Sequence, residues 1–230
     1  MKILEHIRAR RAHIPVRYLF IIAYGRSGST LLQSILASIP GCHMTGENAD
    51  ALGGLFSTWG AALQAKQEQG CVPRTAPGDP WRGAHLIQPD HYNRRLASVF
   101  LEEIIRPPRG ARLIGFKEVR YFHYDENLVE YLDYIRETFQ PCLFIFNRRC
   151  GAEVANSGWW VNDTEDIRER VRRFDCATDE YARAHQDVSI VIDYTRWRSD
   201  PTLLKPIFDR LGEEFRLQQI EKIMAKRLDH

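Results

Sequence analysis

The segment Tyr24–Leu32 combines residue types that bind an anion. It reads YGRSGSTLL after an apolar run, which predicts a strand that turns through two glycines into a helix. Free backbone N–H groups at a helix N-terminus bind phosphate, and hydroxyl and guanidinium groups add directed donors. The residues predicted to hold the anion are Arg26, Ser27, Gly28, Ser29 and Thr30. An ordinary strand–turn–helix junction with serine caps is the structural alternative.

This loop differs from the P-loop of enzymes that use ATP. That motif, G-x-x-x-x-G-K-[ST], supplies a lysine and a hydroxyl to a nucleoside triphosphate and Mg²⁺. Here the two glycines are closer together, and Ser29 stands where the lysine is expected. The sequence therefore counts against a nucleotide kinase, which is kept as an alternative.

A second candidate anion site follows the apolar run 142–147. Two arginines follow this run, and Ser157 comes eight residues after Arg149, on an expected helix. Ligands of open α/β sheets bind at the carboxyl ends of neighbouring strands. Arg149 and Ser157 are therefore predicted to converge on a second anion. The alternative is that Arg149 forms only a surface ion pair.

The elements that would position these residues alternate along the chain. Short β-rich runs separated by helical stretches predict an α/β fold, with a central parallel sheet flanked by helices in three layers. Strands are expected over 16–24, 112–117, 142–147 and 188–194, and helices over 30–39, 126–139, 167–185 and in the last third. Residues 70–89, rich in Pro and Gly, are the one long loop expected, either a lid or surface padding. A length of 230 residues fits a single domain.

Composition limits the partners. A net charge of +2, from 32 basic and 30 acidic residues, argues against a nucleic-acid partner. No apolar run is long enough for a membrane span, and the N-terminus lacks the apolar core of a secretory signal. The five cysteines form no C-x-x-C pair, which indicates reduced thiols and no metal site. We therefore expect a cytoplasmic protein.

Together, the two loops resemble those of the sulfotransferase family that uses 3′-phosphoadenosine 5′-phosphosulfate (PAPS). Arg26–Thr30 matches the family's R-S-G-[ST]-[ST] loop, which holds the 5′-phosphosulfate. Arg149 and Ser157 match the strand-end arginine and the later serine that hold the 3′-phosphate. The motif style is closest to the tyrosylprotein and carbohydrate sulfotransferases and bacterial relatives. The resemblance implies a P-loop-NTPase-like fold, PAPS as donor and 3′-phosphoadenosine 5′-phosphate (PAP) as product.

A third similarity carries departures from the family pattern. Residues 192–215 resemble the family's Y-E-D-L…P…L…L-G segment, but Tyr194-Thr195-Arg196-Trp197 lacks the acidic pair. Cys150 follows Arg149 where the family usually has Asp or Asn, and the late Gly- and Lys-rich loop of some members has no counterpart. These departures motivate a second hypothesis, a catalytically inactive module that binds PAP or PAPS.

The resemblance also implies catalytic roles. Residues 42–48, CHMTGEN, are expected to form a short strand after the first helix and then a loop, and Glu47 in its G-E context is the expected base, provided that burial raises its pKa towards neutrality. Arg26 would stabilise the departing phosphate, and Lys117, at a strand end, would neutralise the sulfuryl oxygens. His43 and His123 are rival bases, because other branches of the family use histidine.

Each of these residues has a structural alternative. Glu47 could cap the following helix, and Lys117 could pair with Glu118 or Asp125 at the surface. Trp159 and Trp160 could stack on adenine or on an acceptor ring, or belong to a helix core.

The acceptor is not identified by the sequence. Its contacts are expected from the loops Gly53–Pro89 and Arg120–Asn127, whose aromatic and basic residues suit a sugar, a phenol or a peptide. We favour a carbohydrate or another small hydroxylated acceptor, and the oligomeric state is left open.

Overall fold

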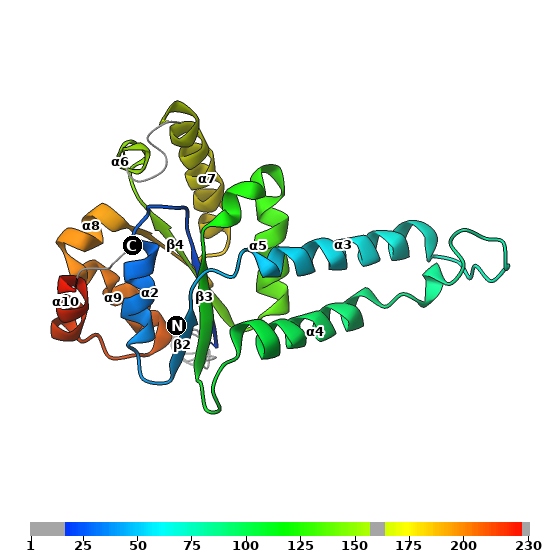
Figure 1. The fold of residues 1–230 in the computed structure, drawn as a ribbon, viewed down its shortest axis with the longest axis horizontal. Coiled ribbons are helices and arrows are strands. Elements are labelled where there is room, and N and C mark those ends of the chain that lie inside the picture. Colours follow the sequence, from blue (N-terminus) through cyan, green and yellow to red (C-terminus); the bar gives the residue numbers. More distant parts are fainter. Residues whose placement is uncertain (1–16, 157–163, 227–230) are drawn as a thin grey trace, which may run out of the picture.

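A five-stranded parallel sheet forms the centre of the computed structural model, which describes residues 17–156 and 164–226 (Figure 1). Its strand order is β2-β3-β1-β4-β5, and all four pairings are parallel. The strands are β1 (Tyr18–Ile22), β2 (Cys42–Thr45), β3 (Leu113–Glu118), β4 (Cys142–Arg148) and β5 (Ser189–Asp193). The predicted α/β fold with a central parallel sheet is confirmed.

Helices cover both faces of the sheet. One face carries α2 (Ser29–Ala37), α8 (Tyr194–Ser199), α9 (Lys205–Leu211) and α10 (Leu217–Ala225), and the other carries α5 (Leu128–Thr138) and α7 (Thr164–Ala184). Alternate residues of β1 serve the two cores, since Phe20 and Ile22 pack towards α5 and α7, whereas Leu19 and Ile21 pack towards α2. This double burial explains why β1 is apolar on both faces.

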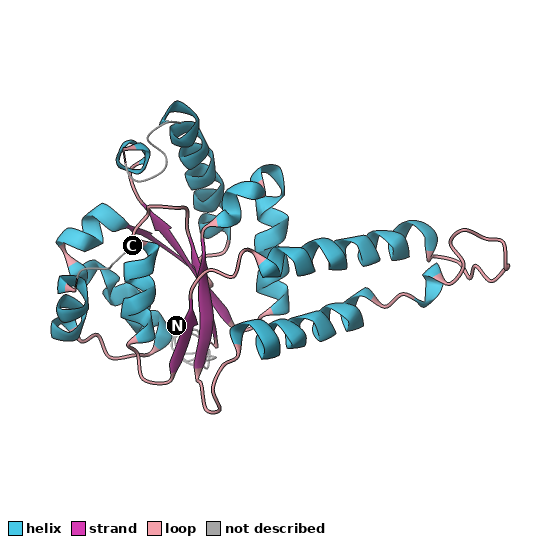
Figure 2. Cartoon of the chain, viewed as in Figure 1, coloured by secondary structure: helices cyan, strands magenta, loops and turns pink. Residues whose placement is uncertain are grey.

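Two helices form an arm that projects from the sheet (Figure 2). They are α3 (Ala51–Gln69) and α4 (Pro89–Val99), and a short π-helix, η2 (Phe100–Ile105), continues α4 towards β3. The expectation of a loop over Gly53–Pro89 is therefore wrong for residues 53–69, which belong to α3, whereas the long loop expected over residues 70–89 is found up to the start of α4. Only Leu52 and Gly53 of α3 are fully buried, and the partly buried Leu55, Phe56 and Trp59 pack against the core on the same side of the helix.

The other expected loop, Arg120–Asn127, consists of two short 3₁₀ turns, η3 (Arg120–His123) and η4 (Asp125–Asn127). Between α3 and α4 the chain is irregular except for η1 (Ala84–Leu86). The remaining short elements are α6 (Gly151–Ala155) and η6 (Pro201–Leu204). No helix in the described part of the chain is long and apolar enough to cross a membrane.

Candidate active site

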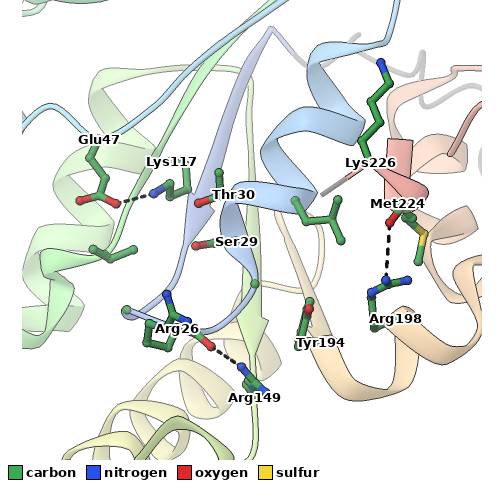
Figure 3. A pocket seen from close by; sticks show the side chains of 14 residues that line it. Arg26, Ser29, Thr30, Glu47, Lys117, Arg149, Tyr194, Arg198, Met224 and Lys226 are labelled. Carbon is green, nitrogen blue, oxygen red and sulfur yellow. Dashed lines mark hydrogen bonds and ion pairs between the residues drawn. The ribbon is translucent and has the colours of Figure 1, made fainter. Parts of the chain in front are cut away.

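A cavity of about 510 Å³ opens at the carboxyl ends of β1, β3 and β4 (Figure 3). Among the described residues, five cationic side chains line it against a single carboxylate, that of Glu47. The cations are Arg26, Lys117, Arg149, Arg198 and Lys226. This imbalance of charge suits an anionic ligand.

The loop between β1 and α2 forms one wall of the cavity. Gly28 is the N-cap of α2 with a φ of 78°, and no side chain caps the helix, so the serine caps considered as the structural alternative are absent from this junction. A Cβ atom on Gly28 would lie 2.0 Å from the Tyr194 ring, so only glycine fits there. Ser29 and Thr30, in the first turn of α2, line the cavity beside the free N–H groups of the helix.

Ser27 differs from its neighbours in the loop. Its side chain is fully buried and is not part of the cavity lining, and its hydroxyl has no hydrogen-bond partner in the described structure. Its carbonyl accepts a 2.9 Å hydrogen bond from Asn147 Nδ2, and Asn147 Oδ1 accepts one of 2.9 Å from Trp197 Nε1. Trp197, in the segment that departs from the family pattern, thereby helps to hold the loop from below.

Arg149, directly after the neighbouring strand β4, reaches the same loop. Its Nη1 donates to the Arg26 carbonyl at 3.0 Å, and its guanidinium lies 5.1 Å from the centre of the Tyr194 ring. Its Nε also forms the ion pair considered as an alternative, at 2.9 Å from Glu153 Oε2. Arg149 therefore lies in the cavity and is oriented by this pair. Ser157, its predicted partner, and Trp159 and Trp160 fall outside the described residues.

Glu47 and Lys117 meet at the opposite side of the cavity. Lys117 Nζ donates to Glu47 Oε1 at 2.5 Å, and Arg120 Nη1 donates to Glu47 Oε2 at 3.2 Å. The Lys117 side chain is 6% exposed, so the surface pair considered for it is wrong. The Glu47 side chain is 36% exposed, and the burial expected for it is not found. Two positive charges, those of Lys117 and Arg120, therefore lie against the Glu47 carboxylate.

The other candidate bases lie away from the cavity lining. His43 Nε2 is 2.8 Å from the carbonyl of Ile105, and His123 is exposed in η3. The N-cap of α3 is Asp50, so Glu47 does not cap that helix. Among the three proposed bases, Glu47 is the one that lines the cavity.

Four lining residues, Val119, Arg198, Met224 and Lys226, were not anticipated from the sequence. Arg198 lies in α8, whereas Met224 and Lys226 lie at the end of α10, and the Arg198 guanidinium is 3.5 Å from the Met224 carbonyl. The amphipathic pattern of residues 217–228 predicts a helix, but it carries no signal for which end of the sheet that helix approaches. In the described parts of the chain, no cluster of His, Cys, Asp or Glu is arranged to hold a metal ion.

Comparison with known proteins agrees with the anion-binding character of the cavity. A family model described as "Sulfotransferase family" matches residues 19–216. The fold is similar to the sulfotransferase domain from the Synechococcus PCC 7002 olefin synthase, with a TM-score of 0.58 and 19% identity, covering 93% of this chain and 78% of that one. No significant match was found among curated proteins.

Two further solved structures are more distant. A sulfotransferase domain from the curacin biosynthetic pathway has a TM-score of 0.49 and 15% identity, covering 88% of this chain and 76% of that one. Sulfotransferase STF9 from Mycobacterium avium has a TM-score of 0.46 and 12% identity, covering 96% and 71%. The family model spans most of the chain, and the first of the three structures shares its P-loop-like fold. The chain belongs to the sulfotransferase family.

Proposed function

We propose that this chain transfers a sulfuryl group from PAPS to a hydroxyl or amine of a small-molecule or carbohydrate acceptor. The observation that supports this most is the juxtaposition, in one cationic cavity, of the N-terminus of α2 and the Lys117–Glu47 pair. An anion bound at the helix N-terminus would be close to a carboxylate that can accept a proton.

The donor site draws on three parts of the cavity. The N–H groups at the start of α2, with Ser29, Thr30 and Arg26, are proposed to bind the 5′-phosphosulfate. Arg149 is proposed to bind the 3′-phosphate, and its contacts with Glu153 and Tyr194 preorganise it for that role. Arg198 and Lys226 add positive charge on the wall formed by α8 and the end of α10, and this charge offsets the several negative charges of PAPS.

The chemistry is proposed to be an in-line displacement at sulfur. PAPS, when bound, supplies a sulfuryl group on a phosphate leaving group. Glu47 takes the proton from the acceptor hydroxyl as the oxygen–sulfur bond forms. Lys117 balances negative charge on the sulfuryl oxygens, and Arg26 with the α2 N-terminus stabilises the phosphate oxygen as its bond to sulfur breaks. No step requires Mg²⁺.

Calorimetric titration with PAP, AMP and ATP·Mg²⁺ tests the donor. We expect micromolar affinity for PAP and at least tenfold weaker binding of AMP, because AMP lacks the group assigned to Arg149. Absence of PAP binding, or a preference for ATP·Mg²⁺, would overturn the proposal and favour the kinase alternative.

Turnover separates an enzyme from an inactive binding module. Release of PAP from PAPS, measured with a phenol and a sugar as probe acceptors, should exceed the rate without protein. Binding of PAP with no turnover would favour the inactive module. One reason to consider the inactive module was the departure of residues 194–197 from the family pattern. This reason is weaker because Thr195 and Trp197 form hydrogen bonds at the site, to Glu153 and Asn147 respectively.

A further inference from the structure

A buried carboxylate lies directly behind the proposed base. Glu118, the last residue of β3, has a relative exposure of 1% and is not part of the cavity lining. Its Oε2 accepts hydrogen bonds from the backbone N–H groups of Asn48, at 3.3 Å, and Asp50, at 2.9 Å. These two residues follow Glu47 in the chain, so Glu118 is bonded to the turn that carries the base.

The other carboxylate oxygen of Glu118 also accepts several hydrogen bonds. Its Oε1 accepts from the backbone N–H groups of Val119, at 2.8 Å, and Arg120, at 3.2 Å, and from Arg120 Nη1, at 2.9 Å. The same Arg120 nitrogen is 3.2 Å from Glu47 Oε2. One carboxylate therefore fixes both the backbone after Glu47 and a cation that contacts the Glu47 side chain.

The turn held in this way has an unfavourable backbone conformation. Ala49 has a φ of 56° and Asp50 a φ of 59°, both in the left-handed region and neither a glycine. Such conformations cost on the order of 1–3 kcal/mol each and persist where surrounding contacts enforce them. The hydrogen bonds from Asn48 and Asp50 to Glu118 are contacts of that kind.

Glu118 is suited to this task by its charge state. Burial opposes its ionisation, but the N–H groups of Val119 and Asp50 and the Arg120 guanidinium outweigh burial and lower its pKa. A carboxylate is an acceptor at every lone pair, so it matches a shell made entirely of donors. With five donors around it and no access to the cavity, Glu118 is not itself placed to take a proton from an acceptor.

We infer that Glu118 is a positioning residue, which holds Glu47 in the orientation from which it takes the acceptor proton. The inference rests on the proposed sulfotransferase reaction. It assigns to Glu118 an effect on turnover rather than on PAPS binding, because the residues proposed to bind the phosphates of PAPS lie in the loop before α2, at the start of α2 and just after β4.

The substitution Glu118→Gln tests this with almost no change in size. A glutamine amide places an NH₂ group opposite N–H donors whichever way it is oriented, so one side of the shell loses its acceptor. We expect kcat to fall about 10- to 100-fold while the affinity for PAP stays within twofold. The matched control is Glu213→Gln, which breaks the 2.8 Å pair with Arg112 just before the other end of β3 and should leave both quantities unchanged.

A double-mutant cycle distinguishes positioning from general damage. If Glu118 acts through Glu47, then adding Glu118→Gln to Glu47→Gln should change turnover of PAPS less than twofold further. The inference would be overturned if the double variant lost turnover by the product of the two single losses, or if Glu118→Gln had the turnover of the wild type.

Amide hydrogen exchange provides a readout that does not depend on an acceptor. Exchange in residues 48–50 should be at least tenfold faster in Glu118→Gln than in the wild type or Glu213→Gln, and equal rates would overturn the inference. If the wild type binds no PAP, the proposed function fails instead, and the exchange result still decides whether Glu118 holds the turn. If Glu118→Gln does not fold, Glu118→Asp replaces it in these experiments. This variant keeps the negative charge on a side chain that is one methylene shorter, and it is expected to show the same effects.

Discussion

At the scale of single residues, Glu47 lies between two cations. Lys117 and Arg120 contact its two carboxylate oxygens at 2.5 and 3.2 Å. Replacing Glu47 with Gln removes the proton acceptor but preserves the shape of the side chain. General-base catalysis typically contributes 10²–10⁴-fold, so we expect kcat to fall by about 100-fold or more. Calorimetry should show unchanged PAP affinity, and near-normal turnover would exclude Glu47 as the base.

Arg149 gives a prediction about binding rather than turnover. Arg149→Ala removes a charge-assisted contact worth about 1.5–3 kcal/mol, so the affinity for PAP should fall roughly 10- to 100-fold. AMP, which lacks the 3′-phosphate, serves as the control ligand and should bind the variant and the wild type equally. An equal loss for both nucleotides would show that Arg149 supports the loop through the Arg26 carbonyl and does not bind the 3′-phosphate.

Only some of the residues that line the cavity could be predicted from the sequence. Arg26, Ser29 and Thr30 belong to a short local motif, and the structure places them in the lining as expected. The Lys117–Glu47 pair joins residues 70 positions apart, and local periodicity has no information about such a contact. The burial of Ser27 likewise depends on Asn147 and Trp197, which come from two other elements.

At the scale of elements, the junction of β1 and α2 depends on one glycine. Gly28→Ala would force a Cβ into the Tyr194 ring at a positive φ. We expect a lower unfolding temperature and a loss of PAP affinity of at least tenfold, because the loop must shift. Gly54→Ala is the matched control, since nothing lies within 4 Å of its Cβ position in α3. That variant should retain PAP binding and gain up to about 1 kcal/mol of stability.

Elements with strong local signals were predicted well. The strands over 112–117, 142–147 and 188–194 are apolar runs bounded by polar residues, and each lies within one residue of its observed limits. The arm was missed because the three glycines of α3 disfavour a helix, although Leu52, Leu55, Phe56 and Trp59 have the i, i+3, i+4, i+7 spacing of an apolar helix face. Its stability depends on aromatic packing at its base, where Phe56 and Trp59 contact Tyr134, a residue of α5.

At the scale of the whole molecule, Asp175 links stability to pH. Burial raises its pKa to about 6, Arg148 only partly opposes this, and one of its oxygens has no hydrogen-bond partner in the described structure. The folded state therefore holds this proton more tightly than the unfolded chain, and stability falls as pH rises from about 4 to 6. Asp175→Asn carries no charge and avoids that loss.

Denaturant unfolding at pH 4.5 and pH 7.5 measures the effect. The stability of Asp175→Asn relative to the wild type should increase between these pH values by on the order of 1–3 kcal/mol. A relative stability that is equal at both pH values would contradict the assignment. Asp209→Asn, at an exposed pair with Lys205 in α9, is a control that should show little pH-dependent difference.

The arm connects the turn that carries Glu47 with the outermost part of the molecule, because α3 begins directly after that turn. With 19 residues, α3 is about 28 Å long, so a rotation of about 10° at its root displaces its far end by about 5 Å. That root is Asp50, which donates its N–H to Glu118 and accepts hydrogen bonds from Tyr124 at 2.5 Å and Tyr131 at 3.0 Å. The turn that carries Glu47 and the start of the arm therefore share one set of hydrogen bonds, so a displacement of α3 at Asp50 would also displace that turn.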